Sequence, residues 1–94
     1  MDDLFSLTLE PSSDVLVQEV AGEAVLLDLA SEQYFGLNEV GVRVWQILTE
    51  HGNPEKAVEI LLDEYEVDEE ILREDVAMLV TGFLESGLMH TPTD

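Results

Sequence analysis

Residues 23–45 read EAVLLDLASEQYFGLNEVGVRVW, and within this stretch a two-strand pattern turns into a helix. Side chains in the first part alternate between two faces, which is the period-two pattern of a strand. One face carries Val25, Leu27 and Leu29, and the other carries Leu26 and Asp28. Strand character resumes from Gln33 to Leu37 after a turn at residues 30–32, so this stretch predicts a hairpin.

The end of the second strand leads directly into a helix. Asn38 is a favoured N-cap, so we expect a helix to begin at Glu39. Gly52 is a typical C-cap residue and ends it. Strand, turn, strand and helix therefore follow one another without a linker.

The residues before the hairpin predict one more strand and an arm. Residues 14–20 alternate like a strand, and Ala21-Gly22 supplies a short turn into the next strand. Three consecutive strands predict an antiparallel meander. Residues 1–13 contain Pro11 and show no clear period, so we expect a flexible N-terminal arm.

The residues after the hairpin predict three helices in total. The second begins at Asn53-Pro54 and ends near Glu66, and the third is capped by Asp68 and closed by Gly87. The apolar face of the third helix is predicted to consist of Leu72, Val76, Leu79, Val80, Phe83 and Leu84. The fold class is thus α+β, with a three-stranded antiparallel sheet followed by three helices resembling a winged helix-turn-helix. The domain spans residues 14–90, and residues 91–94 form a polar C-terminal tail.

Charge excludes several kinds of partner. The chain has 22 acidic residues against three basic ones, a formal net charge of −19, while 46% of its residues are apolar. Such a chain folds but repels nucleic acid and anionic lipid. The charge would attract a basic peptide or a basic protein surface, and it is explained equally well by solubility. It has no cysteine and no apolar run long enough to span a membrane, so we expect a cytoplasmic protein.

Residues that could carry catalysis are few. His51 and His90 are the only histidines, and without cysteine they do not make a usual zinc site. The acidic residues between 63 and 70 lack the glycine and spacing of a calcium loop and serve as well for capping and solvation. No glycine-rich phosphate loop is present. We therefore expect no enzyme activity, no metal and no cofactor.

The second strand of the hairpin is the candidate working surface. Tyr34 and Phe35 must point to opposite faces of the sheet. If Phe35 and Leu37 enter the core, Tyr34 lies on the other face beside Gly36, where the missing side chain permits close approach. Shielding of the sheet by Tyr34 is an equally good explanation from the pattern alone. In a meander this third strand is an edge, which a peptide can extend by main-chain hydrogen bonds.

Several short motifs resemble one known family. They are QYFGLNEVGVRVW, GNPEKAVEILLDEYEVD and REDVAMLVTGFLESGLM, and the likeness covers residues 14–89. They resemble the PqqD-like family, small domains that recognise leader peptides of ribosomally made, post-translationally modified peptides. The hairpin is most similar to the separate recognition proteins of lasso-peptide clusters. One departure is Glu32, where a glycine or another small turn residue is expected.

The resemblance implies both a function and a site. It implies that the chain binds the leader of a precursor peptide as an added strand and presents it to a separate maturation enzyme, a leader peptidase. Peptide-binding residues carried over from the family are Gln33, Tyr34, Phe35, Gly36 and Leu37 on the strand, and Arg73, Val76, Ala77 and Val80 on the third helix.

Other functions stay open at this point. An acidic adaptor or inhibitor would use the negative charge to bind a basic protein surface. A PqqD-type chaperone would serve biosynthesis of the redox cofactor pyrroloquinoline quinone. A DNA-binding winged helix fits the helical half, but a third helix whose only basic residue is Arg73 cannot neutralise several phosphates.

Overall fold

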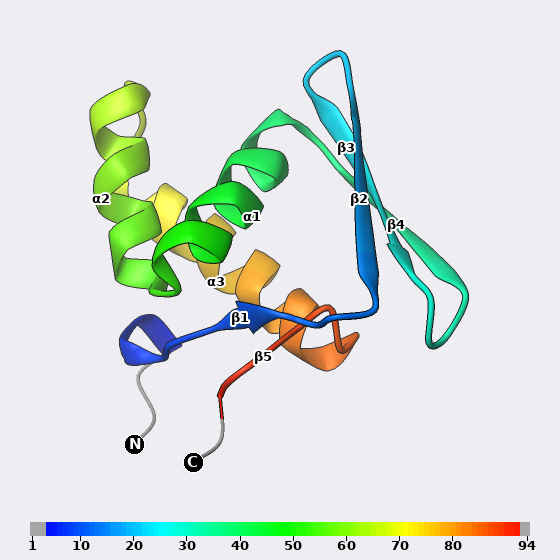
Figure 1. Ribbon diagram of the computed structural model, residues 1–94. Coiled ribbons are helices and arrows are strands. Elements are labelled where there is room, and N and C mark those ends of the chain that lie inside the picture. The colour runs from blue at the N-terminus through cyan, green and yellow to red at the C-terminus, as the bar shows by residue number, and fades with distance from the viewer. Residues whose placement is uncertain (1–3, 93–94) are drawn as a thin grey trace.

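The computed structural model describes residues 4–92 and places a small sheet beside three helices (Figure 1). The elements are η1 (Leu4–Ser6), β1 (Glu10–Pro11), β2 (Val15–Val20), β3 (Glu23–Asp28), β4 (Gln33–Leu37), α1 (Glu39–His51), α2 (Pro54–Glu64), α3 (Glu69–Glu85) and β5 (Met89–His90). Strands β2, β3 and β4 form an antiparallel sheet in that order. The predicted α+β fold, a three-stranded antiparallel sheet followed by three helices, is confirmed.

The register of the sheet separates an inner face from an outer one. Directly paired residues lie on the same face of a sheet. The inner row at the middle of the sheet is Val17, Leu26 and Phe35, and its outer neighbour is Leu16, Leu27 and Tyr34. Leu26 is fully buried, and Phe35 packs against the core beside it. The inner face of the sheet therefore packs toward the helices, and the outer face is directed away from them.

Both hairpin turns use left-handed backbone. Ala21 and Gly22 have φ of 53° and 83°, the pair of positive angles that suits the twist of a two-residue hairpin. In the β3–β4 turn Glu32 has φ 59°, a conformation that favours glycine. Its turn is held by Asp28, whose carboxylate accepts from the Ala30 N–H at 3.1 Å and the Ser31 hydroxyl at 2.8 Å. Glu32, where a glycine or small residue was expected, thus adopts the left-handed conformation itself, and the Asp28 side chain stabilises the turn that contains it.

Each α-helix begins at the cap residue predicted for it. The side-chain oxygens of Asn38, Asn53 and Asp68 accept hydrogen bonds from backbone N–H groups in the first turns of α1, α2 and α3. Gly52, with φ 79°, ends α1 as predicted. Helix α2 ends at Glu64, slightly before the predicted end near Glu66.

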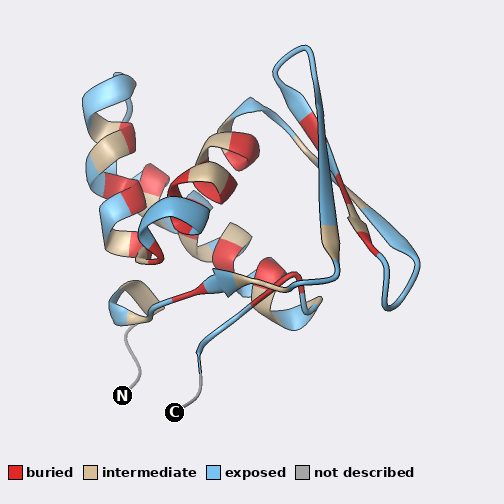
Figure 2. Cartoon of the chain, in the orientation of Figure 1, coloured by how far each residue is buried: buried red, intermediate tan, exposed pale blue. Residues whose placement is uncertain are grey.

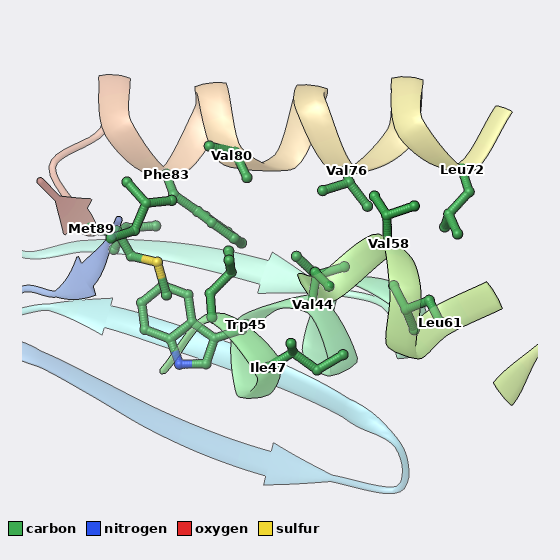
Figure 3. Close-up of a cluster of buried hydrophobic side chains, with 14 of the residues drawn as sticks. Val44, Trp45, Ile47, Val58, Leu61, Leu72, Val76, Val80, Phe83 and Met89 are labelled. Carbon is green, nitrogen blue, oxygen red and sulfur yellow. The ribbon is translucent and has the colours of Figure 1, made fainter. Parts of the chain in front are cut away.

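The core lies where the three helices meet the inner face of the sheet. Figure 2 shows buried positions concentrated on the facing sides of the helices and on β3. Helix α3 contributes Leu72, Val76, Val80 and Phe83, while Leu79 and Leu84 are half-buried. Close to the sheet, the rings of Trp45 and Phe83 meet at 85° with centroids 5.1 Å apart (Figure 3). The apolar face predicted for the third helix is therefore largely part of the observed core.

The N-terminal segment is held more firmly than the sequence predicted. Leu9 is 2% exposed, and its N–H donates to the carbonyl of Gly52 at 2.6 Å. Strand β1 pairs with β5 at the other end of the chain. The prediction of a flexible arm over residues 1–13 is therefore wrong for residues 4–13, because burial of Leu9 and pairing with β5 fix them. Residues 1–3 lie outside the described part.

The C-terminal end of the domain, like the N-terminal segment, packs into the core. Gly87 adopts φ 78°, and the Leu88 N–H donates to the Phe83 carbonyl at 2.9 Å, which closes α3. Leu88 and Met89 are buried, so this end of the chain, which includes β5, joins the core. Of the predicted tail, residues 91 and 92 are exposed, and residues 93–94 lie outside the described part.

Candidate functional site

Strand β4 presents an edge of the sheet to solvent. Within the described residues it pairs only with β3. On the far side of β3, the Leu29 N–H donates to the Asp14 carbonyl at 2.9 Å. Because hydrogen bonding alternates along an antiparallel strand, the even-numbered residues of β3 then bond to β4. Residues 33, 35 and 37 use their backbone groups in that ladder, and Tyr34 and Gly36 direct theirs toward the free edge.

Side chains of β4 alternate as the sequence predicted. Phe35 and Leu37 are half-buried and pack against the core. Tyr34 is 72% exposed on the outer face, and Gly36 is exposed beside it. A Cβ placed on Gly36 would meet no atom within 4 Å, so the backbone there is open to a close neighbour. Gln33 is exposed at the start of the strand.

A groove separates this edge from α3, and we call it the β4–α3 groove. Its apolar part is a hollow of about 280 Å³ whose lining is Phe35, Gly36, Leu37, Met78, Leu79, Gly82, Phe83, Ser86 and Leu88. A second hollow of about 400 Å³ adjoins it, with the lining Asn38, Val40, Asp75, Met78 and Leu79. The two hollows share Met78 and Leu79, so they are neighbours along the helix.

The α3 residues of the groove form one stripe. Asp75, Met78, Leu79 and Gly82 follow one another at offsets of three, four and seven from Asp75, which places them on one side of a helix. Met78 is 73% exposed although it is large and apolar. This stripe is the wall that faces β4.

The α3 residues predicted from the sequence lie mostly elsewhere. Val76 and Val80 are fully buried in the core, on the side of α3 directed at the other helices (Figure 3). Ala77 is half-buried but does not line either hollow, and Arg73 contacts α2. The structure thus brings Phe35, Gly36 and Leu37 into the lining of the groove and leaves Gln33 and Tyr34 exposed outside it. On the helical wall it places the neighbouring residues Asp75, Met78, Leu79 and Gly82.

One sequence signal could have located the wall. The stripe 75, 78, 79 and 82 contains a carboxylate and a glycine among apolar residues, which is unusual for a buried helix face. Val76 and Val80 belong to the all-apolar stripe with Leu72 and Phe83, which is typical of a core. Because α3 is apolar on both sides, periodicity alone did not separate the core from the groove.

Arg73 is a bridge between helices. Its guanidinium binds Glu55 of α2 through two hydrogen bonds of 3.0 and 2.7 Å, and its Nε donates to Glu69 at 2.9 Å. The guanidinium carbon also lies 5.2 Å from the centre of the Phe5 ring. Hydrogen bonds to Glu55 and then Glu69 raise the pKa of Arg73 above its ordinary value, and the same contact lowers the pKa of Glu55. Arg73 therefore ties α3 to α2 and to the N-terminal segment.

Arg43 plays a matching part between α1 and α2. Its Nε and Nη2 donate to the two carboxylate oxygens of Glu64 at 2.9 and 2.6 Å. This hydrogen bonding raises the pKa of Arg43 and lowers that of Glu64. Lys56, the third basic residue, is exposed and forms no ion pair within the described part of the chain. The surface field is therefore strongly negative.

The remaining polar residues do not assemble a reaction centre. His51 lies 3.8 Å from Glu50, and His90 lies 3.4 Å from Glu10, both at the surface. Across residues 4–92, no three histidine, aspartate or glutamate side chains come together as a metal site. The helices in the same range include none that is long and apolar enough to cross a bilayer. A larger hollow of about 600 Å³ lies over the β2–β3 turn end of the sheet, but among the hollows of the described part only the β4–α3 groove combines an apolar lining from α3 with the open strand edge.

Known proteins share both the sequence pattern and the fold. Residues 23–89 match the family model described as coenzyme PQQ synthesis protein D (PqqD). The solved structure "TbiB1 in Complex with the TbiA(beta) Leader Peptide" is 32% identical, with a TM-score of 0.81 over 90% of this chain and 99% of that one. "Lasso peptide synthetase B1 complexed with the leader peptide" is 29% identical, with a TM-score of 0.79 over 88% and 98%. Among curated proteins, none matches the chain.

Proposed function

The chain belongs to the PqqD family, and we propose that it binds the leader of a ribosomally made precursor peptide and presents it to a separate maturation enzyme. The observation that carries this proposal is the free edge of β4 beside the apolar β4–α3 groove. An extended peptide can hydrogen-bond to such an edge while alternate side chains enter the groove. Both similar solved structures are complexes with leader peptides, by their own descriptions.

Binding proceeds by strand addition. The backbone N–H and C=O groups of Tyr34 and Gly36 pair with the peptide, which becomes a fourth strand of the sheet. Side chains on the inner face of the added strand contact Phe35, Leu37 and the α3 wall. Those on the outer face lie beside Tyr34. The main chain supplies affinity without regard to sequence, and the groove supplies selectivity.

The maturation enzyme is a leader peptidase of lasso-peptide biosynthesis. The likeness to a lasso peptide synthetase B1, over 88% of this chain, supports this choice over a role in making pyrroloquinoline quinone. The recognition domain itself carries out no chemical step in this proposal. It raises the local concentration of the precursor at the peptidase, because binding one part of a peptide makes the next encounter intramolecular.

DNA binding has little physical support. Of the three basic residues, Arg43 and Arg73 are each paired with glutamates between helices, which leaves Lys56. One free cation cannot offset the repulsion between a formal charge of −19 and a phosphate backbone. An acidic adaptor that binds a basic protein would use the charge but would leave the open edge of β4 unused.

Calorimetric titration with the two halves of a precursor tests the proposal. The precursor is sought among the short reading frames that neighbour the gene of this chain, and its leader and core are synthesised as separate peptides. We expect saturable 1:1 binding of the leader and none of the core, and faster cleavage of the precursor by the peptidase when the chain is present. Equal binding of both halves, or binding of neither, would exclude the proposed function.

A further inference from the structure

Gly82 occupies a helical position that has no need of glycine. It lies within α3, its φ is not in the left-handed region, and a Cβ added to it would meet no atom within 4 Å. Glycine inside a helix lowers stability relative to alanine. The fold therefore bears this cost without a steric or conformational reason inside the chain itself.

The space above Gly82 belongs to the apolar hollow of the groove. Around it lie Met78, Leu79 and Phe83 from α3, and across it lie Phe35 and Leu37 from β4. A side chain at position 82 would project into this hollow and reduce its depth. The absent side chain thus makes room for one that comes from outside the chain.

Asp75 marks the other end of the same stripe. It lines the second hollow with Asn38 and Val40, and it is the only charged residue in the lining of either hollow. Among the hydrogen bonds and ion pairs of the described residues, none involves its carboxylate. A cationic side chain in this hollow would meet an unpaired carboxylate in a strongly negative field.

We propose that the groove selects its peptide by two side chains on one face of the added strand, an apolar one that fills the hollow above Gly82 and a basic one that pairs with Asp75. This inference rests on the proposed function and names the substrate pattern that the same site reads. Gly82 acts as a specificity-determining residue because it sets the depth of the apolar hollow.

Strand geometry restricts the spacing of the two side chains. Seven residues of α-helix advance about 10 Å, and a strand advances about 3.3 Å per residue. Side chains reach the same face of a strand only at even separations. The reach of a lysine or arginine spans the remaining difference, so the two residues stand two or four positions apart in the peptide.

Selection from a displayed library of random 12-residue peptides tests the pattern. The bait is the full chain, and the strongest peptides are synthesised and titrated against variants. We expect enriched peptides to share a large apolar residue and a lysine or arginine two or four positions apart. Enriched peptides without that pair, or with odd spacings, would overturn the inference while leaving peptide binding intact. Recovery of no peptide at all would instead contradict the proposed function, and the inference with it.

Matched variants locate the two contacts. Gly82→Leu fills the hollow and should weaken the selected peptides at least about tenfold, since a buried apolar side chain loses its place. Thr81→Leu places the same leucine side chain one residue away, at an exposed position outside both linings, and should change affinity by less than about twofold. Asp75→Asn should weaken binding and flatten its salt dependence more than Glu74→Gln, which removes the same charge beside the groove.

A compensating change in the peptide distinguishes filling of the hollow by Gly82→Leu from misfolding of that variant. Peptides whose large apolar residue is replaced by alanine should bind Gly82→Leu at least as well as they bind the wild-type chain. The variant should also melt at or above the wild-type temperature, because leucine is the better helix former. Equal affinity of the original peptides for Gly82→Leu and wild type would overturn the assignment of Gly82.

Discussion

The rings of Trp45 and Phe83 meet edge to face, with centroids 5.1 Å apart and planes at 85°. Trp45 comes from α1 and is 5% exposed, while Phe83 comes from α3 and is 3% exposed. Phe83 also lines the apolar hollow of the β4–α3 groove. This pair therefore joins the core to the back wall of the groove.

Replacing Trp45 by alanine should destabilise the domain severely. Truncation of a buried aromatic side chain typically costs about 3–5 kcal/mol, a large share of a small domain's free energy of unfolding. Thermal and urea melts followed by circular dichroism measure the loss. Met78→Ala, a truncation at a position 73% exposed, is the control and should melt near the wild-type midpoint. An unchanged midpoint for Trp45→Ala would show that the indole contributes little to the core.

Features decided by neighbouring residues were predictable from the sequence. The start of α1 needs only Asn38, whose side chain accepts from the Gly41 N–H at 2.9 Å, and its end needs Gly52 in the left-handed conformation. The alternation of Tyr34 and Phe35 between faces follows from strand geometry. Local signals of this kind also predicted the three strands, the three helices and the edge position of β4.

Features decided by distant contacts were not predictable in the same way. Leu9 is buried because its backbone N–H donates to the Gly52 carbonyl and its side chain joins the helical core. The local sequence around Pro11 contains no pattern that predicts this burial. On α3, Val80 and Leu79 are neighbours of similar hydrophobicity, yet one is buried in the core and the other lines the groove. Only the packing of α3 against α1 and α2 decides which apolar side of α3 is buried in the core and which side lines the groove.

Replacing Arg73 by glutamine should lower stability and leave peptide affinity nearly unchanged. The substitution removes the bridge from α3 to Glu55 and Glu69, and it leaves the groove wall intact. The melting temperature should fall, though less than for Trp45→Ala, and peptide affinity should stay within about twofold. Lys56→Gln removes the same charge without a bridge and serves as the control. A large loss of peptide affinity in the folded variant would instead indicate that Arg73 contacts the peptide, as the family resemblance implied.

The same bridge should respond to acid. Arg73 lowers the pKa of Glu55 in the folded chain, first through hydrogen bonding. A carboxylate with a lowered folded pKa contributes stability above its unfolded pKa, and this contribution disappears as the pH falls through the folded value. The melting-temperature difference between wild type and Arg73→Gln should therefore shrink in acid. A difference that stays constant from neutral to acidic pH would mean that the ion pair is not its source.

Binding of a basic leader should weaken as salt concentration rises. The formal charge of −19 attracts a cationic peptide through a field whose Debye length falls from about 10 Å at 0.1 M to about 3 Å at 1 M salt. Titrations across that range measure the slope. The control is the same peptide with its basic residues changed to glutamine, which should show a flatter dependence. Affinity independent of salt for both peptides would assign binding to apolar contacts alone.

Gly36→Pro should weaken leader binding while the helices remain formed. Proline removes the N–H that Gly36 directs to the free edge and fixes φ near −65°, and the ladder to β3 does not use that N–H. The matched control is Val17→Pro, because alternation directs the Val17 N–H to the opposite free edge of the sheet. Circular dichroism verifies folding, and calorimetry measures affinity. Equal losses in the two variants would show that the peptide does not distinguish the β4 edge from the β2 edge.

Amide hydrogen exchange with and without the leader peptide tests strand addition at β4 most directly. Pairing with a new strand should slow exchange at Tyr34 and Gly36, since their N–H groups point to the free edge, and burial of the groove should slow it along α3 around Met78 and Gly82. Exchange in β2, from Val15 to Val20, should change little. Protection confined to β2, or no added protection at Tyr34 and Gly36 under saturating peptide, would contradict strand addition at this edge.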